Sequence, residues 1–234
     1  MNINERVNTV LITSTQTTMA RVYQWMSIGI LLTAMVSLYI GSSPELIMGL
    51  MRNTILFYGL MIAQIGIVLG LNLSINRISA IAAAALFFLY SALTGVTLSV
   101  IFMVYTAASI QSAFFTTSIG FAGLSAFGLI TKKDLGFLGT FCTMGLFGLV
   151  GMSLLSFFFP SIMGGASGMV FSMVGLLVFS GLTAYDTQKI RLLINQAYTE
   201  EDQKKVAVIG ALTLYLDFIN LFLSILRLMG NRRD

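Results

Sequence analysis

Two acidic residues stand inside otherwise apolar stretches of the sequence. Asp186 follows 51 uncharged residues, and Asp217 lies eleven residues beyond Val206 in the last apolar stretch. An ionisable side chain at membrane depth costs about 2.5–3.5 kcal/mol on insertion scales, so such residues are functional candidates. Two carboxylates that share a low-dielectric site cannot both be ionised cheaply, and they titrate as a unit. We therefore predict a pH-sensing pair that changes charge near neutral pH.

The same two carboxylates are suited to attract a cation. Carboxylate, carbonyl and hydroxyl oxygens are the ligands that a hard ion such as Ca²⁺ prefers. With only Asp186 and Asp217 supplying charge, the site would hold Ca²⁺ weakly, which fits passage better than storage. The plainer alternative is that the two acids form a satisfied hydrogen-bonding pair that holds two helices together.

The composition excludes several other kinds of chemistry. The sequence has no histidine, which removes Ser–His and Cys–His catalysis, histidine-ligated zinc and a histidine pH switch. The single cysteine, Cys142, cannot form an internal disulfide. No glycine-rich phosphate loop follows a strand. We therefore expect no enzyme activity and no cofactor. The modest net charge of +4 indicates membrane orientation rather than nucleic-acid binding.

The elements that must position these residues are membrane-spanning helices. Hydrophobic residues make up 57% of the 234, against only 13 basic and 9 acidic side chains, so a soluble fold has nowhere to bury the apolar surface. A bilayer crossing needs about 20 apolar residues. The gaps between charges predict an all-α integral membrane protein with seven helices, near 23–42, 54–76, 79–104, 110–131, 135–158, 168–187 and 206–228.

Breaks between the helices are predicted at Ser42-Ser43-Pro44, at 106–112, and at Pro160 with Gly164-Gly165. Residues 1–22 form an N-terminal tail, 23–229 the transmembrane domain and 230–234 a short basic tail. The longest polar loop is expected at 189–205.

Lys and Arg set the orientation. With a cytoplasmic N-terminus, nine of them fall on the inner side and one, Arg52, on the outer side, as the positive-inside rule requires. The side of the basic tail, with Arg227, Arg232 and Arg233, stays open at this point.

A polar stripe runs along the last predicted helix. Thr213, Asp217, Asn220 and Ser224 follow the i, i+4, i+7, i+11 spacing of one helix face, and the rest of the helix is apolar. We interpret the stripe as the lining of a central pathway. Arg77, at the inner end of the second span, is a candidate latch that pairs with Asp186 when that acid is ionised. The alternative for Arg77 is an orientation-setting arginine at the interface.

Small residues predict where helices pack closely. Ser91, Gly95 and Ser99 recur every four residues, Gly145, Gly148 and Gly151 every three, and Gly168 and Ser172 at a spacing of four.

Several of these segments together resemble a known family. The segment Leu214–Phe222, followed by Leu226-Arg227, resembles the last-helix signature of the transmembrane Bax inhibitor motif family. Tyr185-Asp186, the segment Lys132–Leu135 and the segment Ser91–Gly95 also match, in the same order. The resemblance covers about residues 20–231 and is closest to bacterial inner-membrane members.

This resemblance implies a specific fold and function. It implies seven helices with the last one central and surrounded by the other six, and a pH-sensitive calcium leak. Asp186 and Asp217 would be the family's aspartyl dyad, and Arg77 would match the arginine that latches the first aspartate. Bacterial relatives are also linked to a membrane-bound ATP-dependent protease, so the alternative is an interaction protein that modulates such a protease or a stress response. That alternative predicts that both aspartates are dispensable.

An intramembrane aspartyl protease is a third possibility. Such enzymes also carry Tyr-Asp in one helix and a second aspartate in the next. Their second motif is Gly-x-Gly-Asp, whereas Tyr215-Leu216-Asp217 lacks both glycines. The prolines, Pro44 and Pro160, are not placed for their Pro-Ala-Leu segment either, so the sequence disfavours this function.

Overall fold

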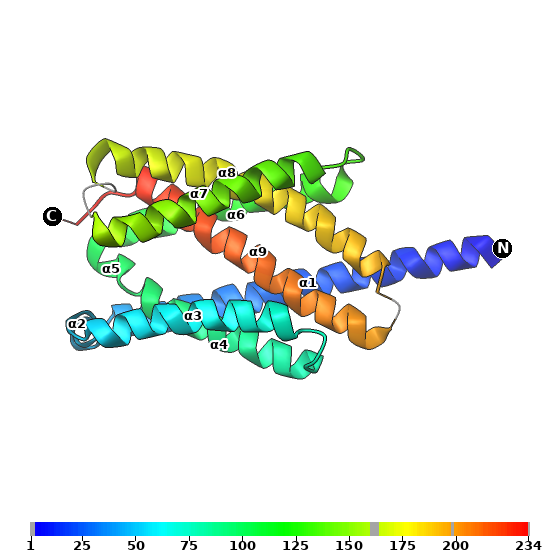
Figure 1. Ribbon diagram of the computed structural model, residues 1–234, viewed down its shortest axis with the longest axis horizontal. Helices are drawn as coiled ribbons and strands as arrows, with labels where there is room; N and C mark the ends of the chain where they lie inside the picture. The colour runs from blue at the N-terminus through cyan, green and yellow to red at the C-terminus, as the bar shows by residue number, and fades with distance from the viewer. Residues whose placement is uncertain (1–2, 160–163, 198, 234) are drawn as a thin grey trace. The chain divides into compact units, whose positions relative to one another are not determined.

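The computed structural model describes residues 3–159, 164–197 and 199–233, and every regular element in this part is helical. In chain order the helices are α1 (Ile3–Gly41), α2 (Pro44–Arg52), α3 (Thr54–Ser74), α4 (Ala80–Leu98), α5 (Ile101–Val104), α6 (Ala107–Ile130), α7 (Gly136–Phe158), α8 (Gly165–Asn195) and α9 (Glu200–Met229) (Figure 1). Within these ranges the sole β-type pairing is an isolated antiparallel contact between Tyr105 and Arg232.

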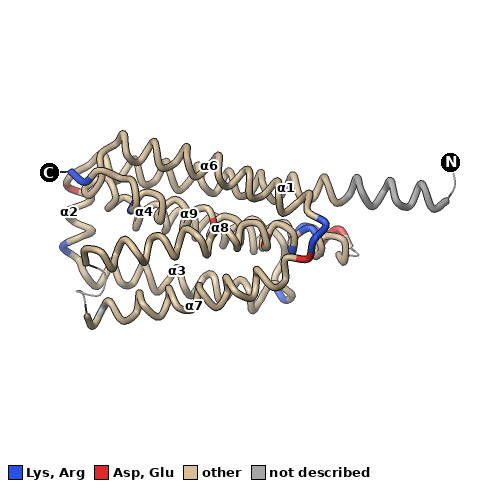
Figure 2. Tube along the Cα trace, turned by 90° about the horizontal axis from the view of Figure 1, so that it is seen from above, with Lys and Arg blue, Asp and Glu red and all other residues tan. Residues whose placement is uncertain are grey.

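Seven of the helical segments are long and apolar enough to cross a membrane, as predicted. They are Thr15–Gly41, Thr54–Ser74, Ala80–Val104, Ala107–Ile130, Gly136–Ser156, Gly165–Asn195 and Glu200–Met229. Charged residues lie mostly at the ends of the helices, with long uncharged runs between them (Figure 2). Large apolar side chains are turned outward, including Phe137, Ile55 and Ile81 at more than 80% exposure. Such a surface suits lipid and marks an integral, multi-pass membrane protein.

Several helices extend beyond the predicted apolar segments. α1 begins at Ile3, so most of the predicted 1–22 tail is helical. No glycine or proline stands in this stretch to break the helix. At the other end, α1 stops at Gly41 and α2 begins with Pro44 in its first turn, which confirms the predicted break. Pro160 lies outside the described residues.

The third span is interrupted rather than continuous to residue 104. α4 ends at Leu98 and α5 starts at Ile101. The hydroxyl of Ser99 donates to the backbone carbonyl of Val96 at 2.6 Å. Serine side chains that bond nearby carbonyls compete with the helical pattern, which accounts for a break at this position.

The chain divides into two compact units. Unit 1 comprises Met1–Val104 and Ile190–Tyr215, and unit 2 comprises Tyr105–Lys189 and Leu216–Asp234. In unit 1, α4 packs along α1 and α3 packs on α4. A side chain at Gly95 would collide with Val36 and with the carbonyl of Thr33, so the two helix backbones approach closely there. This contact confirms the packing role predicted for Gly95.

In unit 2, α8 packs against both α6 and α7 through small residues. Gly128 of α6 lies against the carbonyl of Ala184, and Gly145 of α7 lies against Val178. Gly148 and Gly151 meet nothing within 4 Å, so the packing predicted for these two glycines is wrong. The reason is geometric: residues three apart are rotated by about 300° around a helix, so each step turns about 60° away, and two steps place Gly151 about 120° from Gly145.

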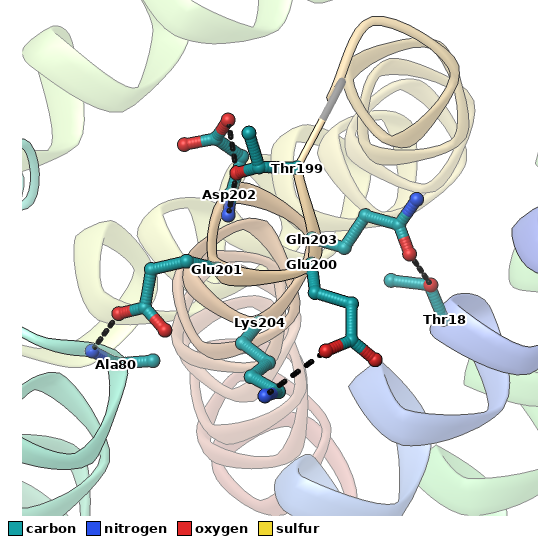
Figure 3. Close-up of polar contacts among 8 residues, drawn as sticks. All are labelled: Thr18, Ala80, Thr199, Glu200, Glu201, Asp202, Gln203 and Lys204. Carbon is teal, nitrogen blue, oxygen red and sulfur yellow. Dashed lines mark hydrogen bonds and ion pairs between the residues drawn. The ribbon is translucent and has the colours of Figure 1, made fainter.

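The connection between α8 and α9 is much shorter than the predicted 189–205 loop. α8 continues to Asn195 and α9 starts at Glu200. The hydroxyl of Thr199 accepts the backbone N–H of Asp202 at 3.0 Å and donates to its carboxylate at 2.6 Å (Figure 3). This reciprocal cap, with acids in the first turn, stabilises a helix start six residues before the apolar stretch.

The first turns of α9 are tied to two other helices of unit 1. Glu201 accepts the backbone N–H of Ala80 at the start of α4, 2.9 Å away, and Thr18 of α1 donates to the side chain of Gln203 at 3.4 Å (Figure 3). In its apolar window α9 is 67% buried, against 6–33% for the other six spans. This burial is consistent with a central last helix; the arrangement of the other six around it stays a prediction.

Candidate functional site

Both predicted aspartates lie in unit 2, Asp186 on α8 and Asp217 on α9, and the structure brings them together. The two groups are neighbours, close enough for the charge of one carboxyl group to act on the other. Asp217 is only 4% exposed, and its Oδ2 is buried without a hydrogen-bond partner in the described structure. Asp186 is less deeply buried. A buried carboxylate oxygen without a partner is costly when ionised, so the site favours a bound proton or a cation.

The α8 segment that carries Asp186 is fixed by its neighbours. Thr187 donates to Ser125 of α6 at 3.4 Å. The amide of Gln188 makes two hydrogen bonds to the turn between α6 and α7: it accepts the N–H of Leu135 at 3.0 Å and donates to the carbonyl of Lys133 at 2.9 Å. Because Gln188 follows Asp186 by two residues, its two hydrogen bonds also hold the helical turn that carries the Asp186 carboxyl group.

The α9 segment that carries Asp217 is held by aromatic contacts. The ring of Phe218 makes edge contacts with Phe114 and Phe121 of α6, at centroid distances of 5.7 and 5.5 Å. Seven residues beyond Asp217, about two turns, Ser224 lies against Gly175 of α8. These contacts set the rotation of α9 about its axis and so direct Asp217 toward α8.

Unit 2 contains a cation near Asp186 that the sequence prediction did not include. Lys189, one turn after Asp186 on α8, is close enough to attract its carboxylate. Its ammonium also lies 5.7 Å from the ring centroid of Tyr185. Arg77 lies in unit 1, exposed on the turn between α3 and α4. The latch between Arg77 and Asp186 therefore stays a prediction.

The supporting polar residues turn their donors toward their own helix. Asn220 donates to the carbonyl of Leu216 at 2.8 Å, and Ser224 donates to the carbonyl of Asn220 at 2.8 Å. Their oxygens keep acceptor capacity, which suits a cation better than an anion. Thr213 is half-buried and lies in unit 1.

A tight metal centre is not built from side chains in the described ranges. No group of three or more His, Cys, Asp or Glu residues comes together there. Tight Ca²⁺ sites use six to eight oxygens with several carboxylates. Asp186 and Asp217 offer two carboxyl groups, and weak Ca²⁺ binding by them stays a prediction.

Sequence reasoning missed two positioning residues. Gln188 looked like one of several polar residues at a helix end, and its partners lie more than fifty residues away in the chain. Tyr215 lay inside the last-helix motif without a role. It is fully buried in unit 1, where its hydroxyl is 2.6 Å from that of Thr33 and its ring meets Phe87 and Tyr90 edge-on. The spacing Tyr215-x-Asp217 in the last-helix motif was the sequence feature that could have indicated a positioning role for Tyr215.

Comparisons with known proteins agree with the motifs. Residues 15–234 match the family described as "Inhibitor of apoptosis-promoting Bax1". The chain is 47% identical over 220 residues to "Inner membrane protein YbhL" of Escherichia coli, covering 93% of each chain. It is also 41% identical over 219 residues to an uncharacterized protein of Borreliella burgdorferi (92% of each), and 41% identical over 220 residues to one of Deinococcus radiodurans (94% of this chain, 92% of the relative). Together with the seven apolar helices, these matches show that the chain belongs to the Bax inhibitor family of integral membrane proteins.

Proposed function

We propose that the protein is a pH-sensitive cation leak through the membrane, with Ca²⁺ as the permeating ion and Asp186 and Asp217 as its gate. The observation that carries this proposal is the buried Oδ2 of Asp217, which has no hydrogen-bond partner in the described structure, beside a second carboxyl group from the neighbouring helix. An oxygen in this position is stabilised by a proton or by a cation.

The pH dependence follows from competition for the same oxygens. When the pair holds a proton, its negative charge is smaller and a divalent cation is attracted less strongly. When the proton leaves, the two carboxylates repel each other unless a cation enters between them. Proton and cation thus exclude one another at Asp186 and Asp217. The acceptor oxygens of Asn220 and Ser224 extend the polar face on which the cation would move.

Several further features belong to the same proposal. The E. coli relative is named as an inner-membrane protein, and we assign this chain to the inner membrane with its N-terminus in the cytoplasm, on the distribution of Lys and Arg. Arg77 would latch Asp186 when that acid is ionised. The protein would act without a cofactor and without catalysis.

The test is Ca²⁺ entry into proteoliposomes that contain a fluorescent indicator, scanned from about pH 5 to pH 8. Wild type, Asp186→Asn and Asp217→Asn are compared with Asp134→Asn. Asp134 is an exposed acid of unit 2 whose Oδ1 accepts the N–H of Gly136 at 2.8 Å. Asparagine keeps that acceptor, so Asp134→Asn removes one acid and leaves the pair intact.

We expect the flux of wild type and Asp134→Asn to vary with pH, and the flux of the other two variants to lose this dependence while circular dichroism remains unchanged. Unaltered pH-dependent flux in Asp217→Asn would refute the gate. If no variant and no wild type conducts above empty liposomes at any pH, the leak itself is refuted. The better hypothesis is then that this protein is an interaction protein that modulates a membrane protease.

A further inference from the structure

A cavity of about 360 Å³ lies in unit 2, beside the C-terminal end of α9 and away from the aspartate pair. Two arginines contribute to it, and none of the described residues that line it is acidic. The lining residues are Tyr105, Gly165, Gly168, Met169, Phe171, Ser172, Arg227, Leu228 and Arg232. The volume lies within the range of small-ligand pockets, about 300–1,000 Å³.

The chain end that supplies Arg232 is held by backbone hydrogen bonds. The N–H of Asn231 donates to the hydroxyl of Ser109 at 2.9 Å, and its carbonyl accepts the N–H of Thr106 at 3.1 Å. Arg232 then pairs with Tyr105. These contacts fix the backbone of Arg232 beside the start of α6, and Arg232 lines the pocket.

Arg227 is held by an aromatic ring. Its guanidinium lies 5.8 Å from the centroid of Phe171, which also lines the cavity. A guanidinium over a ring face keeps its N–H groups available at the edge, where they can donate to an anion. The lining also includes Gly165 and Gly168 of the first turn of α8, which place no side chain over the backbone there.

If each candidate span before Tyr105 crosses the membrane once, the pocket lies on the side opposite the N-terminus. Three spans, Thr15–Gly41, Thr54–Ser74 and Ala80–Val104, precede Tyr105, so the α5–α6 connection and the tail paired with it follow an odd number of crossings. By the same count, nine of the ten Lys and Arg residues before residue 206 fall on the N-terminal side. Arginines gathered on the other side oppose this bias, which points to a local use for their charge.

We propose that this pocket binds the phosphate of an anionic phospholipid headgroup. Two guanidinium groups without an acidic partner among the lining residues suit a phosphate, for which arginine provides paired donors. A lipid is favoured over a free phosphate because the adjacent face of α8 is apolar and open: Met169 is 53% and Val170 is 58% exposed. An acyl chain can follow this face while the headgroup occupies the pocket. The site is separate from the aspartate pair and does not depend on the leak.

The test uses the full chain in a neutral detergent, titrated with phosphatidylglycerol or with phosphatidylcholine of the same acyl chains and followed by native mass spectrometry. The variants are Arg227→Gln and Arg232→Gln. The matched control is Arg52→Gln, since Arg52 ends α2, follows one crossing, and so lies on the same membrane side outside the pocket. Inorganic phosphate is added in a separate arm at constant ionic strength.

We expect one phosphatidylglycerol per chain to bind more tightly than phosphatidylcholine, each pocket variant to weaken this binding about tenfold, and Arg52→Gln to match wild type. Displacement of the lipid by millimolar phosphate would support a phosphate site open to free anions, and no displacement would support a site specific for the lipid. Equal binding of the two lipids, or Arg232→Gln indistinguishable from Arg52→Gln, would overturn the proposal.

A control on folding is needed because Arg227 also lies in the last turn of α9 and complements its dipole. The melting temperature in lipid-free detergent is therefore measured for both pocket variants. Arg232→Gln provides the reading that does not depend on the helix dipole.

Discussion

Replacing Thr33 with valine should destabilise the protein more than replacing Tyr215 with phenylalanine, although both changes break the same hydrogen bond. The hydroxyl of Thr33 has one proton, which it donates to the carbonyl of Ser91 at 2.8 Å. The hydroxyl of Tyr215, 2.6 Å from that of Thr33, must therefore be the donor in the second bond. The order of donation is Tyr215 to Thr33 to Ser91.

The order of donation sets the size of each effect. Tyr215→Phe removes a donor and leaves Thr33 bonded to Ser91, so we expect a loss of about 1 kcal/mol, or less in a membrane setting. Thr33→Val leaves the tyrosine hydroxyl without its acceptor at a site with 0% exposure, which costs about 1–3 kcal/mol. The hydroxyl of Thr94 lies nearby and can accept a hydrogen bond after a small shift, which places the cost in the lower half of this range.

The assay is unfolding of the purified protein by titration with sodium dodecyl sulfate in mixed micelles. The only tryptophan, Trp25, stacks on Phe88 at 5.3 Å between ring centroids and lies in the same unit as the three bonded residues. Its fluorescence therefore reports the relevant packing. The double variant should lose less than the sum of the single losses, by about 1 kcal/mol, because no hydroxyl is then left without a partner. Equal losses in the two single variants, or full additivity in the double one, would refute the proposed order of donation.

Two further predictions concern the residues that position Asp186. Gln188→Leu removes both hydrogen bonds to the α6–α7 turn and should cost about 2 kcal/mol in the same titration, whereas Gln188→Glu keeps one acceptor and should cost less; a reversed order would contradict the clamp. A methyl group at Gly139 would lie 2.5 Å from ring atoms of Tyr185, so Gly139→Ala should destabilise the protein by about 1–3 kcal/mol and alter the pH profile of any flux. Gly148→Ala is the control: the space around Gly148 is open, and the better helix propensity of alanine should leave the melting temperature unchanged or higher. Identical melting of the two alanine variants would argue against the contact with Tyr185.

The number of spans could be predicted because it follows from the cost of placing charge in an apolar phase. An uncharged stretch of sequence has to be long enough to span the bilayer. An acid at membrane depth, such as Asp217, requires a polar or charged neighbour. The exact ends of the helices depend on caps instead. Thr199, with Asp202 three residues later, is a legible start signal for α9, but a count of apolar residues passes over it.

Other parts of the site could not be read from one sequence. The two partners of Gln188 are main-chain groups, and no side-chain pattern marks a carbonyl or an N–H in a distant turn. Glycine spacing was only partly informative. Gly95 meets a neighbouring helix, and in the series with spacing three Gly145 does so too, whereas Gly148 and Gly151 do not.

The continuity of α9 restricts how this protein can change in length. Asp217 lies beside Asp186 of α8, and Ser224, seven residues later on α9, lies against Gly175 of the same helix. Each residue advances a helix by about 1.5 Å and rotates it by about 100°. A single insertion or deletion between Asp217 and Ser224 would therefore turn either the carboxyl group away from Asp186 or the hydroxyl away from Gly175. The segment should accept changes of residue type between these two positions and reject changes of length.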